Sequence, residues 1–125
     1  MAYGYLMALV TLIEPLIMVG IGLVFLKDPP NSINSSYGYR TKRSMINQET
    51  WIFAHHYCGK LWLVCGLVSI PFSLAPMLLV IDKGDEVVSM TGLIVLGIQV
   101  IILLATIIPT ENALKKNFDE FGRPL

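Results

Sequence analysis

The sequence predicts an all-α membrane protein with three transmembrane helices in a single domain, residues 1–125. Hydrophobic residues make up 54% of the chain and charged residues only 14%, whereas a soluble domain carries about 25% charged residues. Apolar runs recur three times, each near the ~20 residues that cross a hydrocarbon core. Nine basic residues balance nine acidic ones, which excludes the strongly basic surface needed to bind nucleic acid.

The first predicted span covers residues 3–26 and contains one charged residue, Glu14. Each Leu, Ile, Phe or Val contributes about −0.3 to −0.6 kcal/mol to insertion, so together they outweigh the roughly +2.5 to +3.5 kcal/mol of one central carboxylate. Pro29 and Pro30 cannot continue a helix, which predicts a break after Leu26.

The second predicted helix begins at Ser44 or Asn47, whose side chains can cap a helix N-terminus. A helix from residue 47 to residue 81 would measure about 52 Å, which is too long for one bilayer core. We therefore predict an interfacial extension over residues 47–60, followed by a span over residues 61–81. Pro71 and Pro76 are expected to kink or interrupt that span.

Aromatic residues near the start of the second span are typical of the belt at a membrane boundary; they are Trp51, Tyr57 and Trp62. The third predicted span, residues 87–108, has one strongly polar member, Gln99. After it we predict a short amphipathic cytoplasmic helix over residues 110–121, in which Glu111 pairs with Lys115 one turn later.

Basic residues predict the orientation, because Lys and Arg accumulate on the cytoplasmic side of a membrane. The connection over residues 27–46 holds four of them against one acid, and the tail after residue 108 holds three more. Both segments are therefore expected in the cytoplasm. This places the N-terminus outside and the C-terminus inside.

Basic, hydroxyl and amide groups gather where the first connection meets the second helix, and such a helix start favours anions. We predict that Arg40 binds a negative group, with lipid phosphate as the default occupant, and that Tyr39 and Trp51 set the depth in the interface. The alternative is that these residues only cap the helix and fix the topology. The predicted ligand-binding residues are Tyr39, Arg40, Thr41, Arg43, Ser44, Asn47, Trp51 and His55.

The same stretch resembles the signature of the SdpI family of small bacterial membrane proteins. The resemblance is specific over residues 38–62 and rests on Gly38, Tyr39, Arg40, Thr41, Ser44, Asn47, Trp51, Ala54 and His55. It implies a protein of the bacterial inner membrane with an immunity role, because the namesake looks like a protein that protects its producer from a secreted, membrane-active toxin peptide. A toxin peptide then joins membrane lipid as an expected partner.

No metal site, cofactor or catalytic group is expected. His55 and His56 are adjacent and point about 100° apart on a helix, so their imidazoles do not converge on one ion. Cys58 lies one turn after His55, but no oxyanion hole or orienting acid is evident in the sequence. We therefore expect a protein that is not an enzyme.

Glu14 is the remaining residue of interest, because an intramembrane carboxylate is a functional candidate. It could pair with Arg40, Lys60 or a histidine, or line a proton-linked pathway. As a neutral acid it could instead bond to Gln99, Thr106 or a carbonyl freed by a proline. The alternatives to immunity are thus a small proton-coupled transporter that uses Glu14, or a scaffold subunit of a membrane complex.

Small residues in the spans could let helices approach closely, either within one chain or across a homodimer. The candidates are Gly20, Gly22, Gly92 and Gly97.

Overall fold

Four helices build the protein in a computed structural model that describes residues 2–34 and 36–125. They are α1 (Ala2–Lys27), α2 (Gln48–Val80), α3 (Asp85–Ala105) and α4 (Ile107–Asn117). Three stretches are long and apolar enough to cross a membrane: Ala2–Lys27, Gln48–Val80, and Asp85–Asn117, which combines α3 and α4. The predicted class, an all-α protein with three candidate transmembrane helices, is confirmed.

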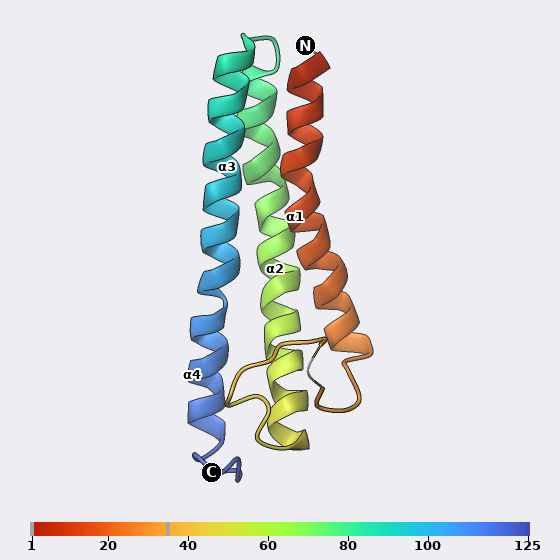
Figure 1. The fold of residues 1–125 in the computed structure, drawn as a ribbon, viewed down its shortest axis with the longest axis vertical. Coiled ribbons are helices and arrows are strands. Elements are labelled where there is room, and N and C mark those ends of the chain that lie inside the picture. The colour runs from red at the N-terminus through yellow and green to blue at the C-terminus, as the bar shows by residue number, and fades with distance from the viewer. Residues whose placement is uncertain (1, 35) are drawn as a thin grey trace.

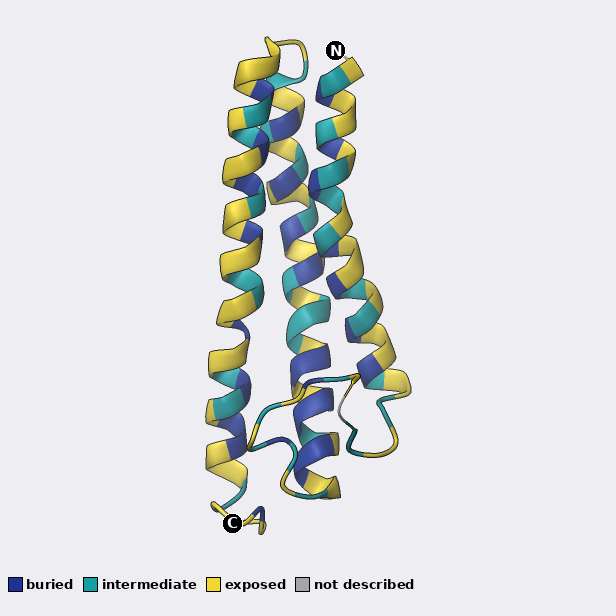
Figure 2. Cartoon of the chain, in the orientation of Figure 1, coloured by how far each residue is buried: buried dark blue, intermediate teal, exposed yellow. Residues whose placement is uncertain are grey.

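The helices stand side by side in an elongated bundle whose two termini lie at opposite ends (Figure 1). We call the end that carries the α1–α2 connection, α4 and the C-terminus the loop end. The outer faces of the helices are exposed along their length (Figure 2) and present large apolar side chains such as Leu9, Phe72 and Leu79. Apolar surface on this scale is suited to lipid rather than to water.

Glycines bring α1 and α2 into close contact. A Cβ atom added at Gly22 would lie 2.7 Å from the Gly59 carbonyl oxygen and 2.8 Å from the Leu63 nitrogen, and Gly66 likewise meets the backbone of α1. Gly20 and Gly97 face open space instead. Of the glycines singled out in the sequence, Gly22 therefore packs against the backbone of α2, and Gly92 packs against the Met7 side chain of α1.

Gln99 links all three long helices near the middle of the bundle. Pro15 has no N–H group and so leaves the Thr11 carbonyl without its helical donor. The buried Gln99 side chain replaces that donor: its Nε2 atom donates to the Thr11 oxygen at 2.6 Å and to Ser73 Oγ at 2.7 Å. In α2, Pro71 and Pro76 lie inside a helix that continues from Gln48 to Val80, so the expected interruption does not occur.

The predicted C-terminal helix is present as α4, but it begins and ends earlier than residues 110–121. Thr106 separates it from α3, and the Thr106 hydroxyl accepts a hydrogen bond from Trp62 Nε1 at 3.0 Å. Helix α4 continues close to the line of α3 instead of turning across the end of the bundle (Figure 1). Its Leu114 packs with Tyr39, Ala54 and Cys58 in a core cluster at the loop end.

Candidate functional site

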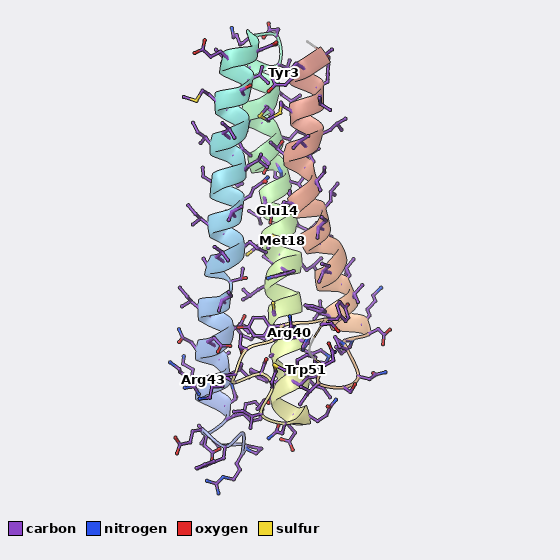
Figure 3. The ribbon with its side chains drawn as sticks, in the orientation of Figure 1. Tyr3, Glu14, Met18, Arg40, Arg43 and Trp51 are labelled. Carbon is purple, nitrogen blue, oxygen red and sulfur yellow. The ribbon has the colours of Figure 1, made fainter. Side chains whose placement is uncertain are left out.

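Trp51 anchors the α1–α2 loop, which we define as residues 28–34 and 36–47. Its indole is fully buried, its Nε1 atom donates to the Pro30 carbonyl at 2.8 Å, and its ring lies 4.3 Å from that of His55. Figure 3 shows Trp51 at the loop end, among the side chains that the loop covers. The buried ring of Trp51 therefore holds the loop on α2, and its role in setting interface depth stays a prediction.

His55 fixes the middle of the loop and is also fully buried. Its Nε2 atom accepts a hydrogen bond from the Tyr39 N–H group at 2.8 Å, while Nδ1 lies 2.7 Å from the Trp51 carbonyl oxygen. A carbonyl only accepts, so Nδ1 carries the proton and the imidazole is neutral. Gly38 beside it has φ +114°, and a Cβ atom there would lie 2.5 Å from His55 Nε2, so this turn requires glycine.

Glu111 on α4 clamps the loop from the other side. Its Oε2 atom accepts hydrogen bonds from the Tyr39 hydroxyl at 2.7 Å and from Thr41 Oγ1 at 3.0 Å. Burial, followed by the bond to the Glu111 carboxylate, raises the pKa of Tyr39, so the phenol stays neutral and donates. The expected pairing of Glu111 with Lys115 is corrected, because the Glu111 carboxylate bonds to Tyr39 and Thr41 of the loop instead. No local pattern signals a contact across 72 residues.

Ser44 and Asn47 have separate tasks. The Ser44 hydroxyl accepts from the Thr41 N–H group at 2.8 Å and donates to the Tyr39 carbonyl at 2.9 Å, which closes a turn. Asn47 caps α2 in a reciprocal capping box with Thr50 and also donates to the Gly122 carbonyl at 2.8 Å. Of the two predicted caps, Asn47 is therefore the one used, and it ties the C-terminal segment to the loop.

The basic side chains remain outside this network. Arg40 and Lys42 are exposed and Arg43 is half-buried. Within residues 2–34 and 36–125 the ion pair present is Arg123–Asp119, at 2.7 Å, and it does not involve the loop. Arg40 lines a cavity of about 280 Å³ between the end of α1 and the α3–α4 junction, and Arg43 lines another of about 410 Å³ beside Glu111 and Glu120. The two arginines therefore face different surfaces (Figure 3).

Glu14 lies about halfway along the bundle (Figure 3) and lines an apolar cavity of about 430 Å³ between α1 and α3. Both of its carboxyl oxygens are buried and have no hydrogen-bond partner among the described residues. The bonds considered for Glu14 from sequence, to Gln99 or Thr106, are not made. Gln99 instead donates to Thr11 and Ser73, while its own Oε1 atom is also buried without a partner in the described part of the chain.

The fold and the loop define a small multi-pass helical membrane protein with a cationic loop packed on its bundle. The sequence model of the SdpI/YfhL protein family matches residues 31–110, which is more than half of the chain. The chain therefore belongs to the SdpI/YfhL family, and the resemblance predicted from residues 38–62 is confirmed.

One curated relative adds to this match. The uncharacterized protein YfhL of Bacillus subtilis (strain 168) is 46% identical to this chain over 52 residues, which are 42% of this chain and 47% of that protein. The matched segment thus spans about half the length of the relative. No solved structure is significantly similar to the chain.

Proposed function

We propose that this protein protects the bacterial inner membrane against a membrane-active peptide, as an immunity protein without enzymatic activity. In this proposal its cationic loop lies at the cytoplasmic leaflet and engages anionic lipid headgroups there. Membership of the SdpI/YfhL family supports the class of function. The excess of Lys and Arg in the loop and the tail supports the orientation, with the N-terminus outside and the C-terminus inside.

One observation carries the proposal: the loop satisfies its own polar groups and leaves its cations free. His55, Glu111 and Ser44 hold the loop backbone and the Tyr39 hydroxyl. Arg40, Lys42 and Arg43 take no part in the ion pairs of the described residues. A preorganised surface of this kind loses little conformational entropy when it binds, and guanidinium groups suit phosphate oxygens.

Removal of the three loop cations tests this proposal. In bacteria challenged with a panel of membrane-depolarising peptides, the triple variant Arg40→Ala/Lys42→Ala/Arg43→Ala should tolerate about a hundredfold less of the peptide against which the wild type protects, since each of the three headgroup contacts near an anionic surface is worth about 1 kcal/mol. The matched control is Lys115→Ala/Lys116→Ala on α4, which should protect like the wild type. Protection by the triple variant at equal membrane abundance would refute the role of the loop.

The orientation is tested separately by labelling. A cysteine at Lys42 should react with a membrane-impermeant maleimide only after the cells are permeabilised. Labelling of intact cells would place the loop outside and would contradict engagement of the cytoplasmic leaflet.

Glu14 favours a second candidate function, proton-coupled transport. Its carboxyl oxygens are buried and unpartnered within the described residues, and such groups bind protons or cations at functional sites. In this case Glu14→Gln should reduce a pH-driven flux of cationic drugs in proteoliposomes about tenfold or more, because the amide cannot carry the proton. Arg40→Ala should leave that flux unchanged. Equal flux in the wild type and Glu14→Gln would remove this candidate.

A further inference from the structure

Two cavities on one side of the bundle adjoin each other. The cavity at Glu14 and the cavity at Arg40 share two lining residues, Trp62 on α2 and Leu103 on α3. Helix α1 leans away from α3 toward the loop end (Figure 1). Together the cavities form one groove, which begins near the middle of the bundle and ends at the loop.

The groove changes character along its length. Its upper part is lined by aliphatic side chains of α1 and α3, such as Ile17 and Leu96, with Glu14 as the one ionisable residue. At the shared position the Trp62 indole N–H is already bonded to Thr106, so its ring offers an apolar surface. The loop end of the groove carries Arg40, exposed and outside the ion pairs of the described residues. The groove is therefore apolar above and cationic at its end.

We propose that this groove holds one acyl chain of an anionic phospholipid, with the phosphate bound by Arg40. This inference rests on the proposed function, which places the loop at the inner leaflet, and it names the ligand that the loop binds there. The length is sufficient: from Val10 to Phe25 the groove follows α1 for about 22 Å, which accommodates an acyl chain that spans the ~15 Å of one leaflet. A helix, whether from a peptide or from a second copy of this chain, is about 10–12 Å wide. Cavities of about 280 and 430 Å³ spread over that length are too narrow to take in a helix.

Lipid selectivity tests the cationic end of the groove. Purified protein is titrated with phosphatidylglycerol or phosphatidylcholine in detergent micelles, and bound lipid is counted by native mass spectrometry. The wild type should prefer phosphatidylglycerol about tenfold, and Arg40→Ala should lose this preference because the charge-assisted contact is gone. The matched control is Lys116→Ala, which removes one positive charge from an exposed site on α4, at the same end of the protein but outside the groove. It should keep the preference within about twofold.

A blocked groove tests the apolar part. Leu103→Trp fills the position that both cavities share, so it should lower binding of both lipids about tenfold by excluding the chain. Ile101→Trp, on an exposed face outside the groove, should bind like the wild type. Glycerol phosphate, which has the headgroup but no chain, should not compete with phosphatidylglycerol. Circular dichroism shows whether each variant is folded. If Leu103→Trp does not fold, the lipid preference of Arg40→Ala still tests the proposal.

Several outcomes would contradict the proposal that the groove binds an anionic phospholipid. An equal loss of selectivity in Arg40→Ala and Lys116→Ala would indicate general electrostatics, and competition by glycerol phosphate would indicate a headgroup site without a chain. Loss of lipid binding in Glu14→Gln would indicate a site for cations instead. If the triple loop variant loses protection in cells while Arg40→Ala keeps its lipid preference, the groove is wrong and the proposed function stands. If Arg40→Ala loses the preference while the triple variant still protects, the groove stands and the proposed function is wrong.

Discussion

Replacement of Trp51 by alanine is expected to destabilise the protein by about 3–5 kcal/mol, the largest effect of any single substitution considered. The indole is fully buried, and its removal leaves a cavity beneath the loop and deprives the Pro30 carbonyl of its donor. Unfolding in mixed micelles by added sodium dodecyl sulfate, followed by circular dichroism, measures the change in free energy.

Two variants make this prediction specific. Trp51→Phe keeps most of the ring but loses the hydrogen bond, so it should lose only about 1 kcal/mol plus a small packing term. Phe72→Ala removes an aromatic side chain that is 75% exposed on the outer face, and it should change the stability much less. An effect of Trp51→Ala no larger than that of Phe72→Ala would mean that the loop does not pack on α2 as described.

Gly22→Val is expected to disrupt the contact between α1 and α2, with a loss of about 1–3 kcal/mol or more. A side chain at this position meets the backbone of α2 at Gly59 and Leu63, and backbone atoms cannot rotate away as a flexible side chain can. The same unfolding assay, supported by crosslinking between cysteines placed on α1 and α2, measures the loss.

Gly20→Val is the matched control, because Gly20 lies on the same helix and a Cβ atom there meets nothing within 4 Å. Both substitutions change the helix propensity in the same way, so the difference between them reports the contact alone. Equal stability of the two variants would contradict the close approach of the helices.

The arrangement of the loop end has a consequence for function. Trp51, His55 and Glu111 each hold a different part of the loop, through its Pro30 carbonyl, its Tyr39 N–H group and its Tyr39 hydroxyl. The loop is thus fastened to both α2 and α4. Its cations are presented by a backbone that is held in place, which is the property that the proposed contact with headgroups requires.

Much of the fold could be predicted from the sequence because its signals are local. The three spans follow from runs of apolar residues, and the cap at Asn47 follows from residues three positions apart in the chain. The basic residues of the loop are equally visible, although the sequence alone grouped the buried Trp51 and His55 with the exposed Arg40 as one ligand-binding set.

The remaining features depend on contacts that no local pattern contains. Glu111 has Lys115 one turn away, yet its carboxylate accepts a hydrogen bond from the hydroxyl of Tyr39, which lies 72 residues away in the sequence. Gln99 bonds to a carbonyl that a proline on another helix has freed, and Glu14, which the sequence suggested as its partner, stays unbonded among the described residues.

The sequence by itself determined the number of candidate spans, because a hydrocarbon core demands long helices whose backbone hydrogen bonds are made within each segment. It also determined the family, through the residue types at fixed spacing in the stretch 38–62. Only the tertiary structure decided which polar side chains hold the loop and which cations stay free. A side-chain hydrogen bond between distant residues forms only after the helices have packed, and this packing is set by the close glycine contacts of α1 with α2 and by the course of α4 beside α2.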